Sequence, residues 1–218
     1  MSPVEDAPHA IQVSERIVGR LSTYRRLLLA ALAEEKSRVY SYELARMADF
    51  TPAQVRRDIM TIGFSGSPAR GYDAAGLLRR ISELLDHPEG HAFALIGVGR
   101  LGQALLAHFD DRHPTLRIVA AFDVDPAVVG RDLHGCHCYG VDELEPVIRQ
   151  RRITLALIAV PAEAAQTVAN RLVAAGVRGL LNFAPTHLNV PERVHVEDVD
   201  ITVALERVAF FSRTPAPF

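Results

Sequence analysis

The stretch "ALIGVGRLGQALLAHFD", residues 94–110, decides the fold. It has the pattern of an apolar strand, a glycine-rich turn and a helix, in that order. The glycines Gly97, Gly99 and Gly102 have the G-x-G-x-x-G spacing of a dinucleotide-binding turn. Gly97 permits the tight turn, Gly99 lets a pyrophosphate approach the backbone, and Gly102 lets the helix pack closely on the strand. The stretch therefore predicts the first strand and helix of a dinucleotide-binding domain.

An acidic residue in the next strand supports this prediction. Asp123 follows the glycine turn by about 20 residues, at the end of an apolar strand. A carboxylate there accepts hydrogen bonds from the adenosine ribose, and its charge disfavours the 2′-phosphate of NADP. We therefore expect NAD or NADH as the ligand. Arg131 is a possible counter-argument, because an arginine can accommodate a 2′-phosphate, but it lies beyond the immediate turn. The alternative is a Rossmann-like sheet whose glycines serve packing alone.

Beyond the turn, apolar strands alternate with helices, with a loop expected between the second strand and the second helix. The predicted strands are 92–98, 116–125, 153–160, 179–184 and 196–205, and the predicted helices begin at Gly102 and cover about 142–151 and 163–176. This alternation is typical of a parallel sheet. We expect a Rossmann-type NAD(H)-binding domain over residues 89–205.

The residues before the turn have helical spacing instead. A long helix from about Ser14 is followed by a short helix over 41–48, for which Ser41 is the expected N-cap. Thr51 is a second N-cap, with Pro52 at the first helical position and Gln54 completing a capping box. Two short helices joined by about three residues form a helix-turn-helix pattern.

A glycine- and serine-rich segment, "GFSGSPARGYD" at 63–73, has the composition of a turn or wing. A further helix over 74–85 leads to a linker at 86–90. Residues 1–88 are therefore predicted to form a winged-helix DNA-binding domain. The fold class is α/β, with this domain preceding the Rossmann-type domain.

The second helix of the helix-turn-helix carries the candidate DNA-binding residues. Gln54 lies near its N-terminus, where side chains meet base edges, and Arg56 and Arg57 follow. Arginine bonds guanine bidentately and glutamine bonds adenine. Arg70 lies in the predicted wing. The alternative is that these arginines form a solvated face.

Composition limits the other possibilities. The chain has 218 residues and a net charge of −2, so DNA contacts must come from local clusters. No apolar run approaches the roughly 20 residues of a membrane helix, and no signal-peptide pattern is seen, so a cytoplasmic protein is expected. The segment "HGCHC", residues 134–138, is too crowded for all its side chains to bind one ion, so no metal is expected; zinc or thiol sensing is the alternative.

No set of residues suggests catalysis. Hydride transfer usually needs an acid or base beside the reacting carbon. The only lysine is Lys36, in the helical half, and His187 stands alone on a predicted loop. We expect the domain to bind its cofactor without using it, so the chain is not predicted to be an enzyme. An NAD-dependent oxidoreductase is kept as an alternative.

Seven phrases, in this order and spacing, resemble the Rex family of redox-sensing transcriptional repressors from about Leu21 to Leu205. They are "TPAQVRRD", "RGYD", "GVGRLG", "AAFDVDPAVVGR", "AVPAEAAQ", "GLLNFAPTHLNVP" and "VEDVDIT". The resemblance implies a winged helix followed by a Rossmann domain, and a homodimer that exchanges a C-terminal helix, here within 206–218. It also implies a repressor that binds a double-stranded DNA operator when NADH is low and releases it when NADH rises.

The resemblance also implies roles for particular residues. The pyrophosphate would be wrapped by Gly97, Val98, Gly99, Arg100, Leu101 and Gly102, with Asp123 on the ribose. The cofactor would be lined by Ala159, Val160 and Pro161, and the nicotinamide bordered by Asn182, Phe183, Ala184 and Pro185. An apolar nicotinamide site would favour the uncharged reduced ring over the cationic oxidised ring. Arg26 and Asp200 match positions that pair across the dimer in one state and separate in the other.

The chain departs from the family pattern at three places. The wing lacks the usual Lys-Arg pair and keeps Arg70, which weakens the expected phosphate contacts. His108 replaces a tyrosine usually near the nicotinamide; it would add pH sensitivity or be a tolerated substitution. The C-terminus after Leu205 is short. These departures leave a second hypothesis, an NAD(H)-binding interaction module without sequence-specific DNA binding.

Overall fold

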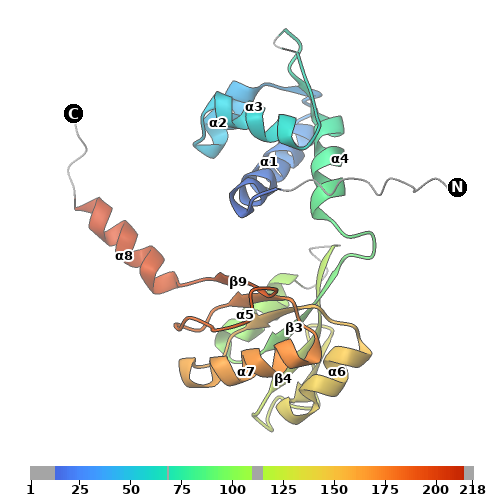
Figure 1. Ribbon diagram of the computed structural model, residues 1–218, viewed down its shortest axis with the longest axis vertical. Helices are drawn as coiled ribbons and strands as arrows, with labels where there is room; N and C mark the ends of the chain where they lie inside the picture. Colours follow the sequence, from blue (N-terminus) through green and yellow to red (C-terminus); the bar gives the residue numbers. More distant parts are fainter. Residues whose placement is uncertain (1–12, 68, 110–114, 214–218) are drawn as a thin grey trace, which may run out of the picture. The chain divides into compact units, whose positions relative to one another are not determined.

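The computed structural model describes residues 13–67, 69–109 and 115–213, and the chain divides into two compact units, Met1–His87 and Pro88–Phe218. Helices in the first unit are α1 (Glu15–Ala33), α2 (Ser41–Ala48), α3 (Pro52–Thr61) and α4 (Ala74–Leu85) (Figure 1). Its strands are β1 (Arg38–Val39) and β2 (Tyr72–Asp73), which pair antiparallel. The winged-helix prediction is confirmed.

The caps explain where the two helices of the helix-turn-helix begin. Thr51 Oγ1 accepts a hydrogen bond from Gln54 N at 3.2 Å, and Gln54 Oε1 accepts one from Thr51 N at 3.0 Å, so the predicted capping box is present. The prediction that Ser41 caps α2 is wrong. Tyr40 is the N-cap residue, because Glu43 Oε2, three residues later, accepts a hydrogen bond from Tyr40 N at 2.8 Å.

The second unit is a seven-stranded sheet in the order β5-β6-β4-β3-β7-β8-β9. Its strands are β3 (His91–Ile96), β4 (Leu116–Asp123), β5 (Asp132–Leu133), β6 (Cys136–Gly140), β7 (Leu155–Ile158), β8 (Gly179–Asn182) and β9 (His195–Asp198). Its helices are α5 (Arg100–Phe109), the 3₁₀ turn η1 (Val141–Glu143), α6 (Leu144–Gln150), α7 (Ala162–Ala175) and α8 (Ile201–Ser212). Every pairing is parallel except β5–β6, so the Rossmann-type prediction is confirmed.

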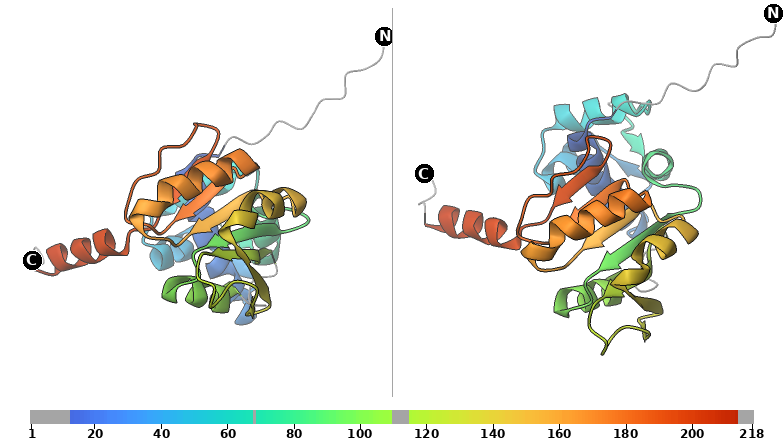
Figure 2. Two further views of the ribbon diagram at one scale, coloured as in Figure 1. Left: turned by 90° about the horizontal axis from the view of Figure 1, so that it is seen from below. Right: turned by 60° about the horizontal axis from the view of Figure 1, so that its bottom comes forward.

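Alternation along the strands builds two cores. Ala94, Ile96 and Phe122 point to the face that α6 and α7 cover. Figure 2 shows α7, in orange, lying along the sheet. Leu95 and Ala121 point to the opposite face, where Leu106 of α5 packs. The strands are apolar on both faces because helices cover both sides of the sheet.

Two strand predictions are wrong. The loop expected before the second helix contains the β5–β6 hairpin, whose Cys136 and Cys138 are buried at alternate positions of β6. The strand expected over 196–205 ends at Asp198, and α8 begins at Ile201. The reason is a helix cap, because Asp200 Oδ1 accepts a hydrogen bond from Val203 N at 3.0 Å. Within the described residues, no helix is both long and apolar enough to cross a bilayer.

Candidate cofactor site and nucleic-acid interface

Three segments predicted to contact the cofactor leave the sheet at one edge. Ile96 of β3 pairs in register with Ile158 of β7, which pairs with Asn182 of β8. The segments that follow, 97–102, 159–161 and 183–185, therefore start side by side at the carboxyl ends of parallel strands. The strand order reverses at β3, which makes this edge the topological switch point where α/β sheets bind ligands.

The glycine turn has the geometry that its three glycines predict. Gly97 has φ +93°, and a Cβ there would collide with the carbonyl of Ala159. A Cβ on Gly102 would collide with the carbonyl of Gly97, because the start of α5 packs directly on the turn. Nothing lies within 4 Å of a Cβ built on Gly99. That open space, at the N-terminus of α5, is where a pyrophosphate would approach the backbone.

The Asp123 carboxylate links the turn to the end of β4. Its Oδ2 accepts a hydrogen bond from Val98 N at 2.5 Å, and its Oδ1 accepts bonds from Val124 N at 2.7 Å and Asp125 N at 2.9 Å. These three bonds hold the carboxylate beside the glycine turn. The residues present thus fit a dinucleotide, and the role of Asp123 toward the ribose stays a prediction.

The other predicted cofactor residues lie along the same edge. The backbone continues the sheet ladder here, since Ala159 N donates to Ile96 O at 2.8 Å and Phe183 N donates to Ile158 O at 2.9 Å. Asn182 and Ala184 are buried, and Pro161 and Pro185 are exposed. The edge therefore has a fixed backbone, and its preference for an uncharged ring stays a prediction.

His108 lies elsewhere in the same unit. It is in the last turn of α5, about 12 Å along the helix from Arg100 at 1.5 Å per residue. Its ring packs edge-on against Phe109, with ring centroids 5.1 Å apart. The structure does not bring His108 to the glycine turn of its own chain, so a role near the nicotinamide stays a prediction.

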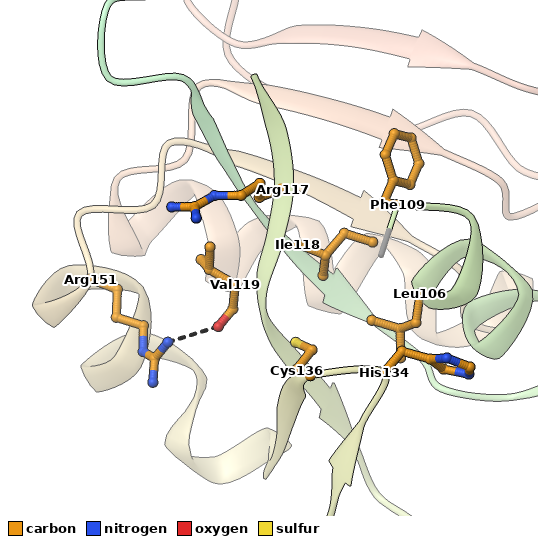
Figure 3. A pocket seen from close by; sticks show the side chains of 9 residues that line it. Leu106, Phe109, Arg117, Ile118, Val119, His134, Cys136 and Arg151 are labelled. Carbon is orange, nitrogen blue, oxygen red and sulfur yellow. Dashed lines mark hydrogen bonds between the residues drawn. The ribbon is translucent and has the colours of Figure 1, made fainter. Parts of the chain in front are cut away.

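A groove of about 360 Å³ lies toward the amino ends of the strands (Figure 3). Arg151 Nη1 donates to Val119 O at 2.8 Å on one side, and His134 and Cys136 lie at one end. Burial raises the pKa of the Cys136 thiol to about 11, which disfavours the reactive thiolate.

The segment 134–138 gives no support to the metal and thiol alternatives. Cys136 and Cys138 are both free and buried, and His137 Nδ1 instead lies 2.7 Å from Asp132 Oδ1. Within the described residues, these side chains do not bring three ligand atoms within 4.8 Å of one another.

In the first unit, α3 presents the predicted DNA-binding residues to solvent. Gln54, Arg56 and Arg57 are exposed, whereas Val55 and Ile59 are buried. Arg56 Nη1 donates to Ser41 Oγ at 3.2 Å, which joins α3 to the start of α2. The Gln54 side-chain oxygen serves the helix cap, so its reading of a base would compete with that cap. Arg70 is exposed in the wing.

Sequence reasoning missed two apolar residues beside Arg56. Tyr42 is 58% exposed and stacks on Tyr40, and Met60 is 72% exposed, one turn after Arg56. With the wing, they line a groove of about 490 Å³. The sequence signal for this groove was a large apolar side chain on the polar face of each of the helices α2 and α3.

The proposed switch residues lie in different units. Arg26 is exposed on α1, and the Asp200 carboxylate caps α8. None of the residues of α8 is buried, and Phe210 and Phe211 are 68% and 70% exposed. Twelve residues of apolar helix without a buried side chain are the usual sign of a surface that another chain covers.

The two units together define a class of protein, a DNA-binding regulator with a dinucleotide-binding domain. Residues 12–59 match the family described as "Putative DNA-binding protein N-terminus", and residues 89–186 match the "CoA binding domain" family. The redox-sensing transcriptional repressor Rex of Syntrophobacter fumaroxidans is 41% identical over 192 residues, which cover 88% of this chain and 91% of that protein. Rex of Rhodopirellula baltica is 40% identical over 206 residues, which cover 94% of this chain and 87% of that protein. The chain belongs to the Rex family of redox-sensing transcriptional repressors.

Solved structures agree with this assignment. The crystal structure of RSP, a Rex-family repressor, in complex with β-NAD⁺ and operator DNA has a TM-score of 0.85 at 29% identity, covering 92% of this chain and 93% of that one. The complex of RSP with β-NADH has a TM-score of 0.82 at 28% identity, covering 92% and 94%.

Proposed function

We propose that this chain is a homodimeric repressor that binds operator DNA through α3 and the wing and releases it when NADH binds the glycine-turn edge. The observation that carries the proposal is the alignment of Ile96, Ile158 and Asn182, which gathers the glycine turn and two further loops at one sheet edge. The RSP complexes with β-NADH and with β-NAD⁺ and operator DNA support the choice of ligands.

The proposal gives each unit one task. Gly97 to Gly102 and Asp123 bind the pyrophosphate and the ribose, and residues 182–185 border the nicotinamide. Gln54, Arg56, Arg57 and Arg70 contact DNA. NADH shifts the dimer between two geometries by binding one of them more tightly.

The proposal extends to assembly, location and activity. The exposed helix α8, and not residues 206–218 alone, forms the dimer contact, and the protein acts in the cytoplasm. The chain acts as a regulator and performs no reaction on its nucleotide, as the repressor function of its relatives suggests.

A gel shift with promoter fragments tests the proposal. The family resemblance implies targets among genes of respiration and fermentation, so fragments of those promoters are used. A shift that NADH abolishes and NAD⁺ leaves in place is expected. Arg57→Ala should lower operator affinity at least tenfold and leave NADH binding unchanged, whereas Arg79→Ala, an exposed arginine on α4, should change neither. If operator affinity survives both Arg56→Ala and Arg57→Ala, α3 does not read the DNA.

The depleted wing favours one second candidate, an NAD(H)-binding interaction module without sequence-specific DNA binding. Arg70 is the one basic side chain of the segment 63–73. Protein that binds NADH but shifts no promoter fragment above the level of random DNA would support this candidate.

A further inference from the structure

The loop that follows β8 is folded around one buried side chain. Asn182 is 1% exposed, and its Nδ2 donates to Thr186 O at 2.8 Å and to Ala184 O at 3.3 Å. Its Oδ1 accepts a hydrogen bond from Ala184 N at 3.1 Å. The conformation of the segment proposed to border the nicotinamide therefore depends on the position of this amide.

The same amide is held by the neighbouring strand. Asn182 and Asp198 are register partners across β8 and β9, and Asn182 Nδ2 donates to Asp198 Oδ1 at 2.8 Å. The backbone repeats the link, because Val199 N donates to Asn182 O at 2.8 Å. The Asn182 amide nitrogen thus joins the loop carbonyls of Ala184 and Thr186 to the Asp198 carboxylate, so a displacement of the loop changes the geometry of its bond to Asp198.

Asp198 is the last residue of β9, three residues before the exposed helix α8 begins. Asp200, two residues later, caps α8 through Val203 N, so the chain from Asp198 to the first turn of α8 is short and hydrogen-bonded. A second contact of Asp198 is weaker. His187 Nδ1 lies 3.3 Å from Asp198 Oδ2, and the His187 side chain is 85% exposed, so this pair adds little.

From these contacts we propose that Asp198 is a positioning residue that couples the cofactor loop to α8, through its hydrogen bond with Asn182. This inference rests on the proposed function and names the route by which NADH reaches the dimer helix. Nicotinamide entry moves the loop at 183–186, the Asn182 amide moves with it, and Asp198 carries the shift to the cap of α8.

The test measures coupling, defined as the ratio of operator affinities without and with saturating NADH. For Asp198→Ala, we expect NADH affinity and NADH-free operator affinity to change less than about threefold, while the coupling falls about tenfold, within the range typical of allosteric coupling. Asp198→Asn keeps an acceptor oxygen toward Asn182 and should retain the coupling within about threefold. His187→Ala and the matched control Glu197→Ala, an exposed neighbour on β9, should retain it fully.

A merely structural role would lower thermal stability without changing the ratio. Unchanged coupling in Asp198→Ala, or an equal loss in Glu197→Ala, would overturn the proposal. Hydrogen exchange on the unsubstituted full chain decides the matter if Asp198→Ala does not fold. NADH should then change exchange at residues 183–187 and 199–203 together, and a change confined to 183–187 would contradict the route. The proposed function itself fails if the unsubstituted protein does not bind NADH, or if NADH does not release it from operator DNA.

Discussion

On α3, the Asp58 carboxylate accepts two hydrogen bonds from the Arg20 guanidinium on α1, at 2.6 and 2.7 Å. The Tyr24 hydroxyl donates a third at 2.9 Å. Asp58 is buried. Burial of Tyr24 is the larger cause, and its hydrogen bond to Asp58 the next, of a Tyr24 pKa well above its usual value. The helix proposed to read DNA is therefore fixed to α1 by a partly buried ionic network.

Loss of this network should destabilise the first unit. Asp58→Ala leaves a guanidinium and a hydroxyl without their acceptor, so we expect the free energy of unfolding to fall by about 3 kcal/mol. Urea denaturation of the full chain, followed by circular dichroism, measures the change. Arg16→Ala, an exposed arginine on α1, is the control and should change stability by less than about 0.5 kcal/mol. Equal effects of the two substitutions would show that the network is not stabilising.

Substitution of the turn glycines should separate folding from binding. Gly99→Ala meets no atom within 4 Å, so it should leave the melting temperature within about 2 °C and weaken NADH at least tenfold. Gly97 has φ +93°, and the Cβ of Gly97→Ala would collide with Ala159 O. This substitution should therefore lower both the melting temperature and the affinity for NADH. Calorimetry and NADH titration give the two readouts. A Gly99→Ala protein with normal NADH affinity would place the pyrophosphate elsewhere.

Asp123 should determine both affinity and nucleotide preference. Asp123→Ala removes the ribose acceptor and the bond to Val98 N, so NADH affinity should fall at least tenfold and the preference for NADH over NADPH should narrow. Fluorescence titration with each nucleotide measures this. Asp132→Ala, on the β5–β6 hairpin, is the control and should bind as the unsubstituted protein does.

The Glu145–Arg171 pair predicts acid sensitivity in the second unit. The guanidinium, through bonds at 2.6 and 2.7 Å, lowers the pKa of Glu145 to about 2 from a usual value of 4.5. Because the folded pKa is the lower one, the stabilisation is present above about pH 4.5 and is lost as pH falls toward 2. Glu145→Gln should therefore be less stable than the unsubstituted protein at pH 6, and the difference should shrink by pH 3. Denaturant titration at each pH measures it; a constant difference would contradict the assignment.

Charges on α8 should separate the proposed dimer. Val208→Asp with Phe211→Asp places two carboxylates on an exposed apolar helix, so sedimentation velocity should show a monomer. Glu206→Gln, a polar change on the same helix, should leave the dimer intact. If the double variant sediments as a dimer, another surface forms the contact.

Most of the fold follows from local patterns. The glycine spacing predicted the turn, and the Thr51–Gln54 pair predicted the start of α3, because both depend on residues a few positions apart. The edge at Ile96, Ile158 and Asn182 was predictable as soon as the sheet was known to be parallel. Two-residue strands such as β5 are too short to show a period of two, which is why the β5–β6 hairpin was predicted as a loop.

Contacts between distant residues could not be predicted. The segment 196–205 is an exception, because its signal is local: the capping bond from Val203 N to Asp200 spans three residues, and the strand prediction overlooked Asp200 as an N-cap. The bond between Asn182 and Asp198 depends on the register of β8 against β9, which no local pattern specifies. Tyr42 and Met60 come together only when α2 and α3 cross.

Within the part of the chain that the structure describes, no side chain of the helix α8 is buried. If a second copy covers these side chains, the amount of assembled protein depends on how much of the chain a cell makes, by mass action. Control of the target promoters would then depend on two quantities, the redox state of the nucleotide pool and the copy number of the regulator. A cell that dilutes the protein during rapid growth would relieve repression even at constant NADH.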